Sequence, residues 1–126
     1  MKLKVLPPTL RKKYHYLILE VKSEVELSKE EMLPPTWDAC IRYWGESHSS
    51  NFDLWVMRHY LIEESTQNNE PIFKYKTVLR CGRNYEDDVR VALSTLTRHN
   101  KKRIAINTIG IAGTIKSGIS KFIDEN

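Results

Sequence analysis

The chain has 126 residues, of which 40% are hydrophobic and 29% charged, a composition typical of a globular domain rather than a disordered segment. This length predicts one domain that spans residues 1–126. Two cysteines are too few for a disulfide-based scaffold, and no apolar run approaches the roughly 18 residues of a membrane-spanning helix. The N-terminus has no apolar stretch long enough for a signal peptide, so we expect a soluble cytoplasmic protein without a membrane partner.

The net charge of +4 hides an uneven distribution of charges along the chain. Residues 1–13 carry five positive charges and no negative charge, residues 14–72 a net charge of −7, and residues 73–121 a net charge of +8. A basic surface of this kind attracts nucleic acid or anionic membranes. The alternative is a pair of oppositely charged, solvated faces without a ligand.

The first third of the chain predicts a strand followed by two short helical segments. Residues 14–22 are rich in β-forming residues and partly alternate, which predicts a strand covered mainly on one face. Ser28 and Glu31 have the spacing of a capping box, so a helical turn is expected to begin there. Pro34-Pro35 is expected to interrupt this turn, and a second helix is predicted over residues 36–45.

Two strands joined by a long loop are predicted next. Residues 52–62 form an apolar, aromatic run without helix-forming features, and residues 72–81 form a second β-forming run. Between them, residues 63–71 are polar turn formers. The three segments together predict a β-hairpin with a long connecting loop.

The clearest predicted helix begins at Asn84, which is expected to cap it, and ends near Arg98 and His99. Its first turn is acidic and its last turn is basic, and both placements favour the helix dipole. Residues 103–109 then predict a last strand, and residues 110–114 predict a turn.

A short final helix is predicted by the apolar stripe of residues 115–123. The order of the predicted elements is therefore β-α-β-β-α-β plus a C-terminal helix. This order predicts an α+β fold in which helices pack on a four-stranded antiparallel sheet, with RRM-like or ferredoxin-like topology.

No catalytic constellation is visible in the sequence. Cys40 and Cys81 lie far apart without a Cys-x-x-Cys motif, and the four histidines fall on different predicted elements. We therefore predict no catalytic residue, no metal ligand and no cofactor bound by the protein.

The third strand does not fit the RNP1 pattern of base-stacking domains. Tyr14 and Tyr16 on the first strand are candidates for base stacking, or alternatively for packing under a helix or a partner protein.

The basic residues form three groups that predict contacts with RNA phosphates. The N-terminal arm, residues 1–13, contains Pro7-Pro8 and delivers its cations to the start of the first strand. A second group begins where the third strand ends, and a third group precedes the last strand. Such contacts supply affinity and register rather than base specificity. The candidate RNA-binding residues, which include members of the final helix, are Arg11, Lys12, Lys13, Tyr14, Arg80, Arg83, Arg90, Arg98, Lys101, Lys102, Arg103, Thr114, Lys116 and Lys121.

The aromatic middle of the chain has two interpretations. Trp55, Met57 and Tyr60 lie in the run that is predicted as a strand at residues 52–62. In an ordinary strand these side chains would pack in the core. Alternatively they form a protein-binding surface, because tryptophan, tyrosine and methionine are enriched at interfaces.

Three blocks of the sequence resemble the protein component 2 family of archaeal RNase P, whose eukaryotic counterpart is a subunit shared by RNase P and RNase MRP. The blocks are residues 6–16, residues 78–85 with 90–93, and residues 108–116. They occur in the family's order and at about its spacing. After the third block the family often continues with further basic residues, whereas this chain has Ser117-Gly118.

The resemblance implies a four-stranded α/β sandwich of RRM-like topology, within a ribonucleoprotein whose RNA is the catalyst. That enzyme cleaves precursor tRNA to release the 5′ leader, and its magnesium ions are held on the RNA. The expected partners are the RNase P catalytic RNA, precursor tRNA, the TIM-barrel protein component 3 and other RNase P protein subunits. The acidic segment around residues 20–31 is a candidate surface for component 3. By position, the resemblance assigns RNA contacts to Arg11, Lys12, Lys13, Arg80, Arg83, Arg90, Thr114 and Lys116.

Two other functions fit parts of the sequence. A different structural RNA-binding protein of the same fold, such as a ribosomal or assembly factor, would carry the same basic patch without a role in tRNA 5′ maturation. A small ferredoxin-like enzyme or ligand-sensing domain would need a pocket with converging polar groups, and the sequence shows none.

Overall fold

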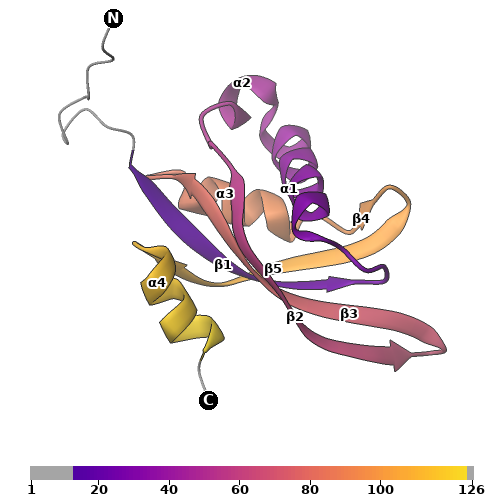
Figure 1. The fold of residues 1–126 in the computed structure, drawn as a ribbon. Helices are drawn as coiled ribbons and strands as arrows, with labels where there is room; N and C mark the ends of the chain where they lie inside the picture. Colours follow the sequence, from indigo (N-terminus) through magenta and orange to yellow (C-terminus); the bar gives the residue numbers. More distant parts are fainter. Residues whose placement is uncertain (1–12, 125–126) are drawn as a thin grey trace, which may run out of the picture.

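The structure is a computed structural model that describes residues 13–124 (Figure 1). The predicted order of strands and helices is present, with short elements added. In chain order the elements are β1 (Tyr14–Ser23), α1 (Lys29–Trp44), α2 (Glu46–Ser49), β2 (Trp55–Gln67), β3 (Glu70–Gly82), α3 (Glu86–Ser94), β4 (Arg98–His99), β5 (Lys102–Ala112), α4 (Ile115–Gly118) and the π-helical turn η2 (Ile119–Ile123).

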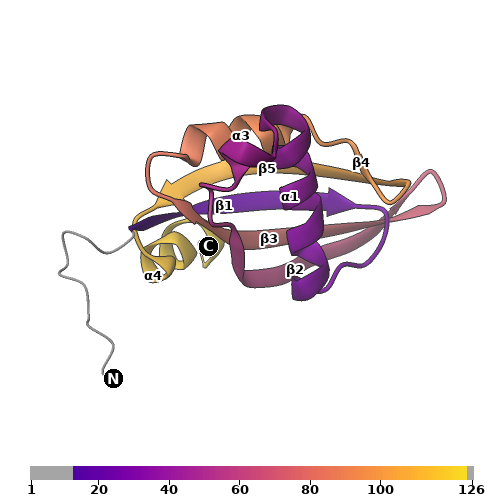
Figure 2. The ribbon, with the colours of Figure 1, turned by 90° about the horizontal axis from the view of Figure 1, so that it is seen from above.

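The strands form one antiparallel sheet in the order β2-β3-β1-β5-β4. The α+β class and the antiparallel sheet with helices packed on it are therefore confirmed. The described part of the chain has five strands rather than the predicted four, because the two-residue strand β4 pairs with the beginning of β5. Figure 2 shows α1 and α3 lying across one face of this sheet, while Figure 1 shows α4 on the opposite face.

The core lies between the sheet and the two long helices. On β1 the predicted alternation places Leu17, Leu19 and Val21 in this core, where none of them is exposed to solvent. Burial of such an aliphatic side chain contributes about 1.5–3 kcal/mol. Ile18 points to the opposite face and is also fully buried, because α4 covers it at Gly118. The central strand is thus covered on both faces at this point.

Helix α1 runs unbroken through the two prolines that were expected to interrupt it, so the predicted break and the second helix start at Thr36 were wrong. The capping box of Ser28 and Glu31 is present and begins the helix as predicted. The prolines cost two backbone hydrogen bonds. The packing of the helix offsets this cost, since Pro35 and Thr36 are buried against the sheet and the Thr36 hydroxyl donates to the Leu33 carbonyl at 2.6 Å.

Strands β2 and β3 form a tight hairpin instead of a hairpin with a long loop. Their pairing continues to Gln67 and Glu70, so the prediction of a loop over residues 63–71 was wrong. The turn consists of Asn68 and Asn69, which have φ values of 53° and 65°. Asparagine tolerates this left-handed conformation, and two such residues make the type I′ turn that suits the twist of a hairpin. The polar residues 63–71, which were predicted as a loop, therefore form the exposed ends of two paired strands and the turn between them.

Helix α3 begins one residue later and ends several residues earlier than the sequence predicts. Its N-cap is Tyr85 rather than Asn84, because Asn84 adopts a left-handed φ of 79° and belongs to the preceding turn. The helix ends at Ser94, and Arg98 and His99 lie in β4 instead of the last helical turn. The acidic first turn predicted for the helix is confirmed.

Strand β5 extends through the glycine that was expected to begin a turn. Gly110 pairs with Ile18 inside the sheet, so the predicted turn over residues 110–114 shrinks to Gly113 and Thr114. A side chain at Gly110 would meet the Phe122 ring, since a Cβ there would lie 2.3–2.6 Å from it. The glycine thus marks a close approach between strand and final helix. The Lys76 ammonium, which donates to the Phe122 carbonyl at 2.9 Å, holds the end of that helix on the sheet.

Both cysteines lie in the core as unpaired thiols. Burial raises the pKa of the Cys40 and Cys81 thiols to about 12. The thiolate is the reactive form of cysteine, so both side chains are protected from thiol reagents while the chain is folded.

Candidate nucleic-acid interface

The strand register brings three distant basic segments to one end of the sheet. Tyr14 pairs with Gly82 on β3, and Tyr16 pairs with Ala112 on β5. The start of β1, the end of β3 and the end of β5 therefore lie side by side, which we call the Tyr14 end. The opposite end, where Ser23 pairs with Phe73 and Ile104, is called the Ser23 end.

Arg80 is the most constrained cation at the Tyr14 end. Its guanidinium carbon lies 4.4 Å from the centroid of the Tyr14 ring, in a cation–π contact. Its Nε and Nη2 atoms donate to the Asp53 carbonyl at 3.3 and 3.2 Å. These contacts fix the plane of the guanidinium before any ligand arrives. The Tyr14 ring, predicted to contact RNA, is positioned here to orient Arg80.

The turn between β3 and α3 presents Arg83 next to Lys13. The Arg83 N–H donates to the Lys13 carbonyl at 3.0 Å, and both residues are exposed. The Gly82 N–H donates to the Phe52 carbonyl at 2.8 Å, which attaches the turn to the buried loop before β2. Arg83 is therefore held by backbone contacts on both sides, and its side chain is exposed and forms no ion pair within residues 13–124, so it can meet a phosphate.

Glu86 links this turn to β1 through a hydrogen-bonded pair with the His15 ring. Partial burial opposes ionisation of Glu86, but the N–H groups of Glu86 and Asn84 and the His15 ring outweigh it and lower the pKa of the carboxyl from 4.5. A carboxylate whose pKa is lowered by folding stabilises the fold at pH values above its ordinary pKa. This contribution is lost as the pH falls through the lowered pKa of the folded chain.

We therefore expect Glu86→Gln to lower the free energy of unfolding at neutral pH, because the amide makes weaker contacts with His15 and the Asn84 N–H. The difference from the parent should narrow as the pH falls below 4.5, and urea unfolding across that range measures it. Glu64→Gln, at an exposed position, is the matched control. A difference that stays constant with pH would contradict the assignment.

The final helix adds Lys116 to the Tyr14 end, on the face of the sheet that α1 and α3 leave open (Figure 1). The Thr114 hydroxyl caps this helix by accepting from the Ser117 N–H at 3.1 Å, so its predicted RNA contact competes with a capping role. Lys121, one turn beyond, is exposed and lies 5.8 Å from the Phe122 ring centroid.

Arg58 is a basic residue of this region that the sequence analysis did not single out. It lines a groove with residues of the final helix, namely Ile115, Lys116, Ile119, Ser120 and Asp124. Arg58 was missed because it lies in the acidic segment of residues 14–72. Its position as a cation within the largely apolar segment of residues 52–62 is the feature by which Arg58 could have been found.

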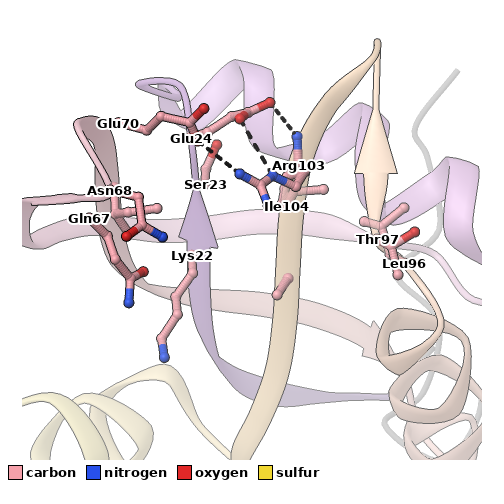
Figure 3. Close-up of a pocket in the computed structure, with 12 residues that line it drawn as sticks. Lys22, Ser23, Glu24, Gln67, Asn68, Glu70, Leu96, Thr97, Arg103 and Ile104 are labelled. Atoms are coloured by element: carbon pink, nitrogen blue, oxygen red, sulfur yellow. Dashed lines mark hydrogen bonds and ion pairs between the residues drawn. The ribbon is translucent and has the colours of Figure 1, made fainter.

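The third predicted basic group lies at the Ser23 end, on the β4–β5 hairpin. Figure 3 shows Arg103 there, facing Glu24 and Glu70. Its Nη2 donates to Glu70 at 2.8 Å, its N–H donates to Glu24 at 2.7 Å, and its Nε lies 3.7 Å from the second Glu24 oxygen. The structure thus divides the candidate set between the two ends of the sheet, with Arg98, Lys101 and Lys102 beside Arg103 at the Ser23 end.

The remaining candidates stand apart from both clusters. Arg90 lies on the exposed side of α3 and pairs with Asp87 at 3.1 Å. Arg11 and Lys12 lie outside the described residues, so their predicted contacts stay predictions.

The aromatic middle of the chain divides between core and surface. Phe52, Leu54 and Val56 are buried, whereas Trp55 is 54% exposed at the beginning of edge strand β2. Met57 and Tyr60 are half-buried. Further along the same strand Leu61 and Ile62 are each 50% exposed. The edge strand therefore carries an apolar surface in addition to its core side chains.

Within residues 13–124, no group of three or more His, Cys, Asp or Glu side chains is arranged to hold a metal ion. Each histidine has a partner inside the fold: for example, the His48 Nε2 lies 2.8 Å from Asp88, and the His59 ring contacts Thr77 and the Leu27 carbonyl. None of the helices in this range is long and apolar enough to cross a membrane.

Comparison with known proteins relates this fold and its basic end to one family. The sequence profile of the Rpp14/Pop5 family of ribonuclease P matches residues 15–123. Ribonuclease P protein component 2 of Methanobrevibacter smithii is 46% identical over 125 residues, which cover 99% of this chain and all of the relative. The proteins of the same name from Methanothermobacter thermautotrophicus and Pyrococcus abyssi are 40% and 37% identical, over 96% and 99% of this chain and 94% and 97% of their own lengths. The chain therefore belongs to the Rpp14/Pop5 family, which confirms its resemblance to ribonuclease P protein component 2.

Proposed function

We propose that this subunit of ribonuclease P binds the catalytic domain of the RNase P RNA through the Tyr14 end of its sheet. Its family makes it part of an endoribonuclease complex that processes the 5′ end of precursor tRNA. The observation that carries the proposal is the fixed guanidinium of Arg80, which Tyr14 and the Asp53 carbonyl hold beside Arg83 and Lys13.

The arrangement suits recognition of a folded RNA by its backbone. Cations that converge from three chain segments match closely packed phosphates, and contacts of this type give affinity and register without reading bases. A-form RNA exposes phosphates and 2′-hydroxyls rather than readable base edges, so proteins recognise it largely by shape. The subunit neutralises phosphates and stabilises one RNA conformation, and the RNA with its magnesium ions performs the cleavage.

The fold supports the assignment to RRM-like topology, although the sheet is not used in the way of a base-stacking domain. The order β2-β3-β1-β5 with α1 and α3 on one face is the order that a split βαβ unit produces. The open face carries α4, and the Tyr14 ring on this face is engaged by the Arg80 guanidinium. RNA is therefore bound at an end of the sheet and not across its centre.

The apolar edge of β2 is the surface that we assign to another protein subunit. Trp55, Leu61 and Ile62 are each at least half exposed along a strand whose outer edge is unpaired in the described residues. Exposed aromatic and aliphatic side chains of this kind are typical of protein interfaces. Family resemblance favours the TIM-barrel component 3 as the partner, with α1 and its acidic first turn as a second possible contact.

Reconstitution of the enzyme tests the proposal. Precursor tRNA is incubated with RNase P RNA and component 3, with or without this chain, at limiting magnesium. We expect the chain to increase the rate of 5′ leader release, because phosphate neutralisation lowers the magnesium that the RNA needs. RNA binding without any gain in cleavage would favour the alternative, a structural RNA-binding protein of the same fold with another role.

A further inference from the structure

The β4–β5 hairpin carries a basic cluster that is far from the Tyr14 end. The pairs Arg98–Arg103 and His99–Lys102 place three basic side chains and a histidine on the paired strands, and Lys101 lies in the turn between them. Between this hairpin and the Tyr14 end lies the length of β1, ten residues or about 33 Å at the rise of an antiparallel strand. One RNA phosphate group cannot contact both clusters, so the hairpin needs an explanation of its own.

Within residues 13–124, Arg103 is the one Lys or Arg side chain of the hairpin that has carboxylate partners. Arg103 is held by Glu24 and Glu70, as Figure 3 shows. Among residues 13–124, no carboxylate lies within ion-pair distance of Arg98, Lys101 or Lys102, and all three are exposed. The pKa of Glu24 is lowered first by the hydrogen bond from the Arg103 N–H and then by the charges of Arg103, Lys102 and Arg98, which together outweigh the opposing effect of burial. Arg103 thus serves as the anchor, and the other three cations project into solvent.

The turn of this hairpin places a lysine where another residue type would be less strained. Asn100 and Lys101 have φ values of 51° and 67°. The left-handed conformation suits glycine or asparagine, as the Asn68-Asn69 turn of the β2–β3 hairpin illustrates, and is unfavourable for a side chain such as lysine. Strain of this kind persists where a function repays it. The strained conformation of Lys101 therefore indicates that a cation is required at the tip of the hairpin.

The hairpin is also held firmly to the rest of the fold. His99 lies 3.7 Å from the Asp38 carboxylate of α1, on one side. Arg103 contacts Glu24 and Glu70 on the other side. The projecting cations are therefore preorganised, and little conformational entropy is lost when they meet a rigid ligand.

We propose that the β4–β5 hairpin binds a second RNA segment, distinct from the segment at the Tyr14 end, so that the subunit bridges two parts of the same RNA. The inference rests on the proposed function and extends it. A phosphate backbone is favoured over a protein partner because lysine is depleted at protein interfaces and the hairpin has no exposed apolar anchor. Bridging explains why one small chain places basic residues at both ends of its sheet: each contact raises the effective concentration of the other.

Tethered cleavage locates both RNA segments. Thr97→Cys beside the hairpin and Gly113→Cys at the Tyr14 end are exposed, and a Cβ at Gly113 meets nothing within 4 Å. Each variant is labelled with an iron chelate that generates hydroxyl radicals, and bound to a transcript of the RNase P RNA from the same organism. The native thiols are buried, so the parent protein treated with the same reagent is the control.

We expect the two tethers to cut two separate RNA segments. Cuts at the same nucleotides, or cuts from the Gly113 tether alone, would overturn the bridge while leaving RNA binding at the Tyr14 end intact. When component 3 is added to the complex, cuts by the Thr97 tether in the backbone of component 3 instead of the RNA would also overturn the bridge. Absence of cuts from both tethers, together with absence of binding, would reject the proposed function itself.

Salt dependence measures the hairpin contact independently. Lys101→Gln with Lys102→Gln should reduce the slope of log affinity against log salt by about 1.4–1.8, since each neutralised phosphate contributes about 0.7–0.9. Lys29→Gln with Arg42→Gln removes the same charge from α1 and should leave the slope unchanged. Equal changes in the two double variants would show a general field effect and overturn the hairpin site.

Discussion

Replacing Phe52 with alanine is expected to lower the free energy of unfolding by about 3–5 kcal/mol, the usual cost of removing a fully buried aromatic ring. Phe52 is 0% exposed and its ring lies among aromatic neighbours, with centroids 5.2 Å from His48 and 5.5 Å from Tyr85. The cavity cannot close easily, because those rings are themselves held: His48 contacts Asp88 at 2.8 Å. Urea unfolding of the purified chain measures the change.

The matched control for this substitution is Tyr43→Ala. Tyr43 is also aromatic but is 48% exposed on α1, so its removal should cost a small fraction of the Phe52 effect. Phe52 also lies under the turn that carries Arg83, since its carbonyl accepts from the Gly82 N–H. The variant should therefore lose RNA affinity in addition to stability. Equal unfolding midpoints for Phe52→Ala and Tyr43→Ala would show that the aromatic cluster is not part of the core.

Local patterns were sufficient for the elements whose burial and capping are encoded by neighbouring residues. The alternation along β1 gave its core face, and Ser28 with Glu31 gave the beginning of α1. The errors arose where tertiary packing overrides a local preference. Two prolines remain helical because Pro35 is buried, and Gly110 remains in a strand because Phe122 packs on it. Neither contact is visible from the residues on either side.

The candidate site was harder to predict than the fold, because it depends on strand register. Sequence adjacency grouped Arg98 to Arg103 with the other basic residues, but the pairing of β1 with β3 and β5 places them at the far end of the sheet. The same register brings Lys13, Arg80 and Arg83 together from segments about 70 residues apart. Arg103 illustrates a second limit: its two carboxylate partners come from β3 and the loop after β1, so its charge is compensated.

Removing the cations of the Tyr14 end should have the largest effect on RNA binding. Arg80→Gln, Arg83→Gln and Lys116→Gln together eliminate three side chains that face one end of the sheet. Charge-assisted hydrogen bonds contribute about 1.5–3 kcal/mol each, so the loss of three should raise the dissociation constant for the RNase P RNA by about 1,000-fold or more. The slope of log affinity against log salt should fall by about two to three, and filter binding over a salt series measures both quantities.

Two variants separate a specific contact from a loss of net charge. Lys29→Gln, Arg42→Gln and Lys74→Gln together remove the same charge from other surfaces, and should shift affinity far less. Arg80→Lys keeps the charge but cannot make both hydrogen bonds to the Asp53 carbonyl or present a planar guanidinium to Tyr14. It should therefore preserve the salt slope while weakening binding. If Arg80→Lys bound as tightly as the parent, the orientation of the guanidinium would be irrelevant and the Tyr14 end would act only as a diffuse positive field.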